Sequence, residues 1–192
     1  MLKRYLALFF IIGLITPLKM VWGENYNFRN TRWGMTQEDV IAAETMDPIE
    51  KDKNSITYKT RVLEKDVALR YVFAQDKLIG ASYMLDDNYI NSEQFIQTYA
   101  QFKKELIKKY GQPVKDITQW KNDAFKKDRS KWGMALSLGY LEYFTFWETP
   151  VTTVSCGLKE KNYQVLCSVE YWSLEFSNLL DKNKNENKPD PF

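Results

Sequence analysis

The chain of 192 residues contains no histidine. Histidine is the side chain whose ordinary pKa lies near neutrality, and its neutral imidazole is a common metal ligand. Its absence excludes Ser-His-Asp and Cys-His nucleophile systems, imidazole general bases and zinc sites that need a histidine ligand. We therefore name no catalytic residue, no metal ligand and no cofactor from the sequence.

Glycine-rich phosphate-binding motifs are also missing, since the eight glycines form neither a GxGxxG fingerprint nor a P-loop. Carboxylate chemistry remains open, because two acidic residues can hydrolyse a glycoside without histidine. Candidate acids are Asp86, Asp87, Glu142 and Glu148, but a chain with 25 acidic residues offers many such pairs. We therefore predict that the protein is not an enzyme. The alternative is a carboxylate-dependent hydrolase acting on a cell-envelope glycan.

The overall composition is that of a folded domain. With 44% hydrophobic and 27% charged residues, the chain is too apolar to be disordered and too polar for a polytopic membrane protein. A chain of this length can bury one sizeable core. We expect a single domain over residues 24–180, followed by a polar segment at 181–192 that contains two prolines and is typical of a mobile tail.

The first 23 residues have the pattern of a cleavable signal peptide. Two basic residues precede a 14-residue apolar run, Tyr5–Leu18, and Val21 and Gly23 occupy the positions that a signal peptidase inspects. The run is shorter than the roughly 20 residues of a membrane span, so a retained anchor is the lesser alternative. We predict export to the periplasm or the medium and no membrane span in the mature chain.

Removal of residues 1–23 changes the charge balance. The segment holds three basic residues and no acid, so the formal charge falls from +2 to −1, with 24 basic residues against 25 acidic ones. Nucleic-acid binding depends on a marked basic excess gathered on one face. We therefore predict no nucleic-acid partner.

Apolar periodicity predicts two helices with recognisable ends. Thr36 caps a short helix that runs to about Ala43. Asn91 begins a longer one, with Gln94 as its capping-box partner and Gly111 at its end. The signal from 114 to 139 is weak: we expect a helical turn or two over 124–131, interrupted by Gly133. A short helix is expected over 174–180. Six strands are predicted, at 56–62, 67–73, 79–85, 140–147, 151–159 and 163–172.

Pairing of the first strands follows from their apolar faces. A turn at Glu64-Lys65 sets Val62 opposite Val67, Tyr58 opposite Tyr71 and Ile56 opposite Phe73. On the other face, this register places the like charges of Lys59 and Arg70 opposite each other. A three-residue loop, 75–77, then sets the third strand beside the second, with Ala81 opposite Tyr71.

The last hairpin carries both cysteines of the chain. A turn at Lys161-Asn162 sorts apolar residues to one face and polar residues to the other, and it places Cys156 opposite Cys167. Opposed strand residues lie within reach of a disulfide, and an exported protein meets an oxidising compartment. We therefore predict a Cys156–Cys167 disulfide, with two buried free thiols as the alternative.

These elements predict an α+β fold, with an antiparallel sheet and helices packed on one face. Their order is consistent with a duplicated αβββ unit over 28–86 and 91–173. The segments WGMTQEDV (33–40) and LIKKYGQP (106–113) resemble those of a group of exported bacterial proteins to which no activity is assigned. The arrangement is also similar to the small outer-membrane assembly lipoproteins and to the tandem-repeat β-lactamase inhibitor proteins, a likeness that concerns the fold.

An uncovered sheet face is the predicted place for binding. It carries Lys59, Arg61, Arg70, Glu170 and Trp172, and this mixture of arginine and tryptophan with polar side chains suits recognition of a protein. The alternative is an ordinary solvent-exposed sheet face with no binding role. We predict an exported binding or envelope-interaction protein whose partner is another protein or a cell-envelope component. A glycan-binding module is a further alternative.

Overall fold

The computed structural model describes residues 26–87, 89–176 and 178–179. It is a mixed α+β structure dominated by one eight-stranded antiparallel sheet. The predicted α+β class with an antiparallel sheet is confirmed. The predicted signal peptide and polar tail lie outside the described residues, as does part of the helix predicted over 174–180.

The elements follow one another along the chain as α1 (Gln37–Ala43), β1 (Glu50–Lys51), β2 (Ser55–Val62), β3 (Lys65–Ala74), β4 (Lys77–Leu85), α2 (Glu93–Tyr110), β5 (Lys115–Trp120), a 3₁₀ turn (Arg129–Lys131), α3 (Trp132–Ser137), β6 (Leu141–Glu148), β7 (Thr152–Lys161) and β8 (Gln164–Ser173).

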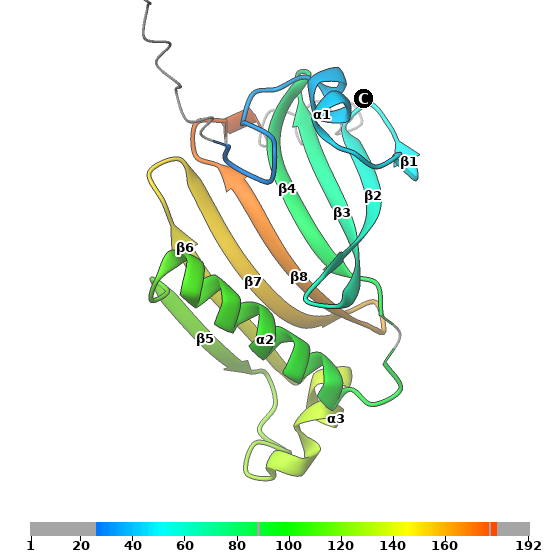
Figure 1. The fold of residues 1–192 in the computed structure, drawn as a ribbon. Helices are drawn as coiled ribbons and strands as arrows, with labels where there is room; N and C mark the ends of the chain where they lie inside the picture. The colour runs from blue at the N-terminus through cyan, green and yellow to red at the C-terminus, as the bar shows by residue number, and fades with distance from the viewer. Residues whose placement is uncertain (1–25, 88, 177, 180–192) are drawn as a thin grey trace, which may run out of the picture.

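The strand order across the sheet is β1-β2-β3-β4-β8-β7-β6-β5. Strands β4 and β8 therefore pair at the centre, although a long stretch of chain separates them. Figure 1 shows one continuous, twisted sheet, with α2 lying across its lower half. Helix α2 packs on β7 and β8 through an apolar stripe that includes Ile96, Tyr99, Phe102 and Leu106.

Helix α1 begins at the predicted cap. The Thr36 hydroxyl oxygen accepts a hydrogen bond from the Asp39 backbone N–H at 3.2 Å, and the Asp39 carboxylate accepts one from the Thr36 N–H at 3.1 Å. The predicted capping box at the start of α2 is wrong in detail. The Asn91 side-chain oxygen accepts a hydrogen bond from the Glu93 N–H at 3.0 Å, and the helix starts two residues after Asn91.

Two features between 111 and 139 differ from the predictions. Strand β5 pairs along β6 in a stretch where the sequence pattern was too weak to predict a strand, because its side chains are nearly all exposed and show no apolar alternation. Gly133 does not interrupt a helix but lies inside α3. A Cβ there would come within 2.8 Å of the Glu93 backbone nitrogen, so glycine permits the close contact between α3 and the start of α2.

The β2–β3 hairpin is shifted by two residues from its predicted register. The turn is at Leu63-Glu64 rather than Glu64-Lys65, and both turn residues have positive φ values, as type I′ turns require. Tyr58 consequently faces Leu69 rather than Tyr71. Because side chains alternate with a period of two, this shift leaves every side chain on its predicted face.

The register predicted for β3 and β4 is confirmed over most of its length, with Tyr71 opposite Ala81 and Val67 opposite Leu85. The loop itself is different. The turn has only two residues with positive φ, Gln75 and Asp76, and an irregularity between Val72 and Phe73 takes up the difference. A two-residue turn together with a bulge thus gives the register of a three-residue loop.

The predicted disulfide is wrong, and both cysteines are free and buried. The β7–β8 turn lies at Asn162-Tyr163, one residue later than predicted, so Cys156 faces Val169 and Cys167 faces Leu158. The cysteines are therefore diagonal neighbours. Such neighbours lie about 7–8 Å apart, which is too far for a disulfide.

The Asn162-Tyr163 turn allows a direct test of this register. Tyr163 has φ 64° and is fully exposed, so its side chain has no packing to lose. Replacing a residue held at positive φ with glycine removes backbone strain, and we expect Tyr163→Gly to raise the free energy of unfolding by about 0.5–1 kcal/mol. Urea denaturation gives the measurement. Tyr163→Ala, which removes the ring but keeps the strain, is the matched control and should give no gain; equal effects of the two variants would contradict the turn.

Candidate functional site

Helix α2 covers one face of the sheet over β7 and β8, whereas the side chains on the opposite face of these strands are more exposed. Cys156, Leu158 and Val169 point toward α2 and are buried, whereas the alternating residues Ser155 and Ser168 point the other way and are only partly buried. We call the face opposite α2 the open face. Six of its eight strands were predicted from the sequence, β1 and β5 were not, and several of the predicted facing pairs differ.

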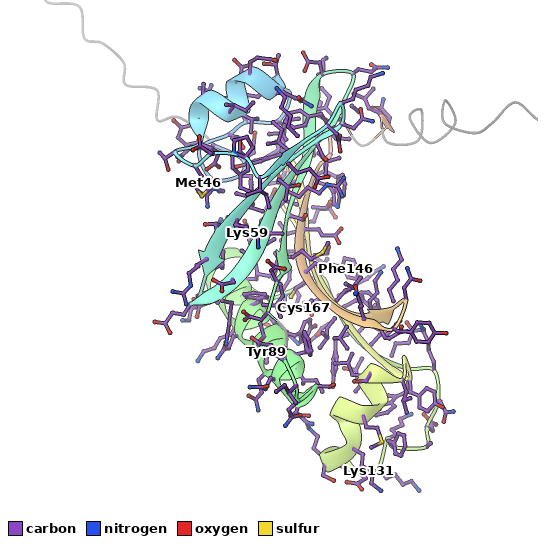
Figure 2. The ribbon with its side chains drawn as sticks, turned by 90° about the vertical axis from the view of Figure 1, so that its right-hand side faces the viewer. Met46, Lys59, Tyr89, Lys131, Phe146 and Cys167 are labelled. Carbon is purple, nitrogen blue, oxygen red and sulfur yellow. The ribbon has the colours of Figure 1, made fainter. Side chains whose placement is uncertain are left out.

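A groove of about 380 Å³ crosses the open face over β4, β8, β7 and β6. Figure 2 labels Phe146 on the side of the sheet away from α2. Phe146 and Met84 are 36% and 38% exposed, which is high for large apolar side chains on strands that pair on both sides. We call this groove the open-face groove. Its lining residues are Met84, Phe144, Phe146, Ser155, Gly157, Lys159, Lys161, Leu166, Ser168 and Glu170.

The open-face groove has an apolar floor and a basic end. The rings of Phe144 and Phe146 lie 6.5 Å apart at an interplanar angle of 18°. The Lys159 ammonium lies 5.9 Å from the centre of the Phe144 ring. Within the part of the chain that the structure describes, neither Lys159 nor Lys161 has an ion-pair partner. An acidic group could therefore approach this end without displacing an existing salt bridge.

Two of the predicted binding residues, Glu170 and Trp172, lie at or beside the groove. The Glu170 carboxylate accepts hydrogen bonds from the Ser168 hydroxyl and from the Trp172 indole N–H, each at 3.2 Å. The indole lies over Gly80, where a Cβ would come within 2.4 Å of the ring. Trp172 therefore packs on the backbone of β4 at Gly80 and is hydrogen-bonded to Glu170.

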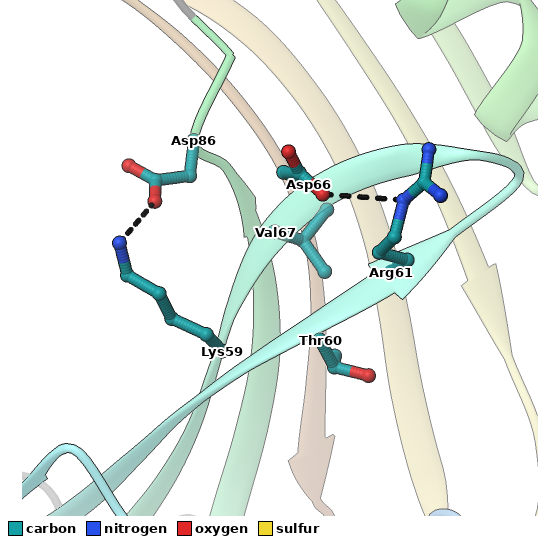
Figure 3. A pocket seen from close by; sticks show the side chains of 6 residues that line it. All are labelled: Lys59, Thr60, Arg61, Asp66, Val67 and Asp86. Atoms are coloured by element: carbon teal, nitrogen blue, oxygen red, sulfur yellow. Dashed lines mark ion pairs between the residues drawn. The ribbon is translucent and has the colours of Figure 1, made fainter.

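The predicted residues Lys59 and Arg61 line a separate hollow of about 570 Å³ near the tip of the β2–β3 hairpin (Figure 3). Lys59 pairs with Asp86 at 3.4 Å, and Arg61 pairs with Asp66 at 3.2 Å. All four side chains are about half exposed or more, so each pair contributes little to stability. The structure does not join this hollow to the open-face groove.

The predicted opposition of Lys59 and Arg70 is wrong. With the register shifted by two residues, Lys59 faces Ala68 and Arg70 faces Thr57. Arg70 donates a hydrogen bond to the Ser55 hydroxyl at 3.1 Å. Lys59 and Arg70 therefore do not repel each other as a directly opposed pair, and no covering anion is needed to relieve such a repulsion.

Three of the four candidate acids have separate partners. Asp86 pairs with Lys59, Asp87 accepts a hydrogen bond from the Tyr89 hydroxyl at 2.9 Å, and Glu142 pairs with Lys121 at 2.5 Å. Among the described residues, no group of three or more potential ligands is placed to hold a metal ion. No helix in the described ranges is long and apolar enough to cross a membrane.

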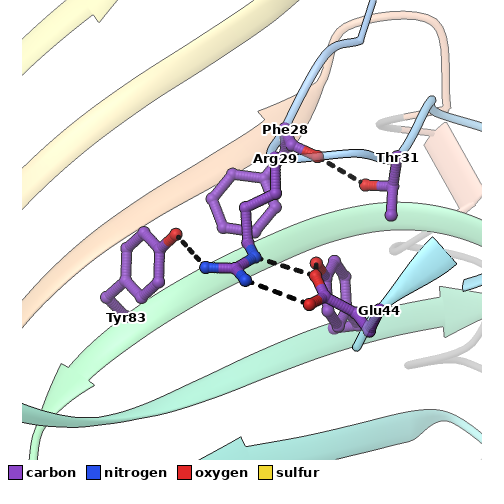
Figure 4. Close-up of polar contacts among 6 residues, drawn as sticks. Phe28, Arg29, Thr31, Glu44 and Tyr83 are labelled. Atoms are coloured by element: carbon purple, nitrogen blue, oxygen red, sulfur yellow. Dashed lines mark hydrogen bonds and ion pairs between the residues drawn. The ribbon is translucent and has the colours of Figure 1, made fainter. Parts of the chain in front are cut away.

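A partly buried charged network connects the N-terminal segment to the sheet (Figure 4). Arg29 donates two hydrogen bonds to the Glu44 carboxylate, at 2.8 and 3.0 Å, and the Tyr71 hydroxyl donates another. The Glu44 side chain is only 1% exposed. Burial favours a lower pKa for the Arg29 guanidinium, but its hydrogen bonds to Glu44 and Tyr83 outweigh this and raise that pKa above its ordinary value. The sequence offered no periodic signal for this pairing.

The free thiols lie under α2 rather than in a reactive setting. Burial raises the pKa of the Cys167 thiol to about 12, and burial together with the nearby Cys167 raises that of Cys156 well above its ordinary value. Reactive cysteines instead have lowered pKa values and access to solvent. The two cysteines therefore serve as small apolar core residues.

The apolar groove floor was missed in the sequence, although a signal for it exists. The predicted strand at 140–147 carries large apolar side chains on both faces, since Phe144 and Phe146 alternate with Tyr143 and Trp147. A strand of this kind is expected to be buried on both faces or to meet a partner on one of them. That inference was available from residue alternation alone.

Comparison with known proteins adds no relative. No protein-family model matches the sequence, and neither a curated protein nor a solved structure is significantly similar to the chain.

Thiol labelling tests the placement of the cysteines. At pH 8, both raised pKa values keep the thiols protonated in the native protein, so we expect Ellman's reagent to react very slowly with Cys156 and Cys167. In denaturant both should react at once. Absence of free thiol after denaturation would show a disulfide, and rapid reaction in the native state would show that the thiols are not buried.

Two buried tyrosines on neighbouring strands form a matched pair for stability measurements. The Tyr58 hydroxyl is buried and has no hydrogen-bond partner among the described residues, whereas that of Tyr71 donates to Glu44. We expect Tyr58→Phe to raise the free energy of unfolding by about 1 kcal/mol and Tyr71→Phe to lower it by about 2 kcal/mol. Guanidinium denaturation measures both. Equal effects on the free energy of unfolding would mean that the hydrogen bond from Tyr71 to Glu44 does not stabilise the fold.

Proposed function

We propose that the protein is an exported, non-enzymatic binding protein whose open-face groove receives a segment of a partner protein. The observation that carries this proposal is the apolar floor of the groove, where Phe146 and Met84 are exposed and Phe144 is partly buried on interior strands of the sheet. In a strand with one face in solvent, apolar residues on the buried face normally alternate with polar residues on the solvated face, as they do in β2. Exposed aromatic and methionine side chains are enriched where proteins meet.

We further propose that the helices all pack on the face opposite the groove. We also propose that the two αβββ series are related units, the first ending in β4 and the second in β8. The predicted signal peptide is taken to bring the chain into the cell envelope. The resemblance to small envelope proteins and to tandem-repeat inhibitor proteins agrees with a binding role, although it rests on the order of elements alone.

The partner segment is expected to be apolar with an acidic flank. Apolar side chains would cover Phe144 and Phe146, while a carboxylate would meet Lys159 and Lys161 at the basic end. Rim charges of this kind mainly speed association and select the partner, whereas the buried apolar contacts supply most of the affinity.

Glycan binding is the second candidate. The near-parallel phenyl rings of Phe144 and Phe146 are the observation that favours it, since sugar rings stack on aromatic faces. Glu170 and Ser168 would then serve as hydrogen-bonding groups at the same groove.

Site-specific cross-linking in the native cell tests the proposal. A photoreactive phenylalanine analogue at position 146 should give one discrete adduct, formed by a chain that lacks residues 1–23 and is found outside the cytoplasm. Lys159→Glu combined with Lys161→Glu should lower the adduct yield severalfold, because it reverses the charge at the basic end. The adduct is identified by mass spectrometry after fractionation of the cell.

The matched control places the same analogue at Leu138, which is 51% exposed and follows α3. Similar products from both positions would overturn the proposal. Protease treatment separates the two candidates, since a polypeptide adduct is digested and a glycan adduct is not. An unprocessed chain in the cytoplasm would contradict export without bearing on the groove.

A further inference from the structure

We propose that a second site, on the face that carries α2, binds a small apolar carboxylate. The site is a pocket between α2, the tip of the β2–β3 hairpin and the central strands, and it is separate from the open-face groove. We call it the α2 pocket. It is lined by Val62, Leu63, Tyr83, Phe102, Glu105, Leu106, Lys109, Val169 and Tyr171.

The walls of the α2 pocket come from three parts of the chain that the central strand pairing brings together. Tyr83 and Val169 face each other across β4 and β8. Phe102 and Leu106 line the pocket from α2, and Val62 lines it from the end of β2. Except at its rim, the lining is apolar or aromatic. Such a lining cannot satisfy bound water, so an apolar group gains by entering.

The size of the pocket limits its ligand. Its volume of about 150 Å³ is well below the range of about 300–1,000 Å³ that is usual for drug-sized ligands. An apolar cavity of about 150 Å³ is known to hold a molecule as small as benzene. The α2 pocket therefore suits a single ring or a short alkyl chain.

The charge at the rim selects an anion. Glu105 pairs with Lys108 at 2.7 Å, whereas Lys109 has no ion-pair partner in the described part of the chain. The Lys109 ammonium lies 5.0 Å from the centre of the Tyr110 ring, at the end of α2. A carboxylate at the rim would therefore meet the Lys109 cation, which has no ion pair, beside a Glu105 carboxylate that Lys108 already engages.

This inference goes beyond the proposed function and does not depend on it. The probes are hexanoate, hexanol and hexylammonium, which share one alkyl chain and differ in charge. We expect chemical-shift changes confined to the methyl groups of Val62, Leu106 and Val169, with a Kd for hexanoate on the order of millimolar and weaker binding of hexanol and hexylammonium. Methyl-labelled NMR titration of the chain gives each value.

Lys109→Gln isolates the role of the charge. It should weaken hexanoate binding about threefold and leave hexanol unchanged, because only the carboxylate uses the cation. Lys104→Gln, on the same helix but outside the pocket, is the matched control and should change neither. Val62→Phe, which fills the pocket, should abolish the shifts from every probe.

Four outcomes would overturn the proposal. The first three are binding of hexylammonium as tight as that of hexanoate, equal effects of Lys109→Gln and Lys104→Gln, and the absence of localised shifts at tens of millimolar probe. Binding of hexanoate only after removal of residues 180–192 would also overturn it, because the pocket would then belong to a segment of the chain itself. Lys109→Gln changes an exposed side chain, so its result does not depend on a folding defect.

Discussion

The pairing of β4 with β8 is the interaction on which the rest of the structure depends. These strands are far apart in the chain, and closing the loop between them costs conformational entropy. The buried aromatic cluster around this joint offsets that cost: the Phe28 ring lies 5.3 Å from that of Tyr83 and 4.7 Å from that of Tyr171. Both candidate sites span the joint, since the open-face groove uses Met84 with Leu166 and the α2 pocket uses Tyr83 with Tyr171.

The segments 33–40 and 106–113 make contacts that hold the fold together. In the first segment, the Trp33 indole donates to Thr152 at 2.8 Å, the Gly34 N–H donates to the Leu78 carbonyl at 2.8 Å, and Thr36 caps α1. In the second, Gly111 ends α2 with φ 80°, and its carbonyl accepts a hydrogen bond from Trp147 at 2.9 Å. These segments therefore hold elements of the fold together, and the second one also contributes Leu106 and Lys109 to the α2 pocket.

Prediction from the sequence succeeded where a pattern is local and failed where two arrangements share one pattern. The cap of α1, the stripe of α2 and the sorting of strand residues to two faces each follow from neighbours in the chain. The registers of the β2–β3 and β7–β8 hairpins do not, because moving a two-residue turn by one position shifts the pairing by two and returns each side chain to its face. That shift alone separated Cys156 from Cys167 and Lys59 from Arg70.

The sequence by itself determined the class of fold, the faces of the predicted strands, both ends of α1, the end of α2 and the exclusion of histidine chemistry. Only the tertiary structure decided which strands are neighbours, the pairing of Arg29 with Glu44 and the setting of the thiols, and it alone brought together the walls of the groove and the pocket. The physical reason is range. Periodicity and capping act over a few residues, whereas these sites are assembled from side chains that are distant in the chain and become neighbours only when the central strands pair.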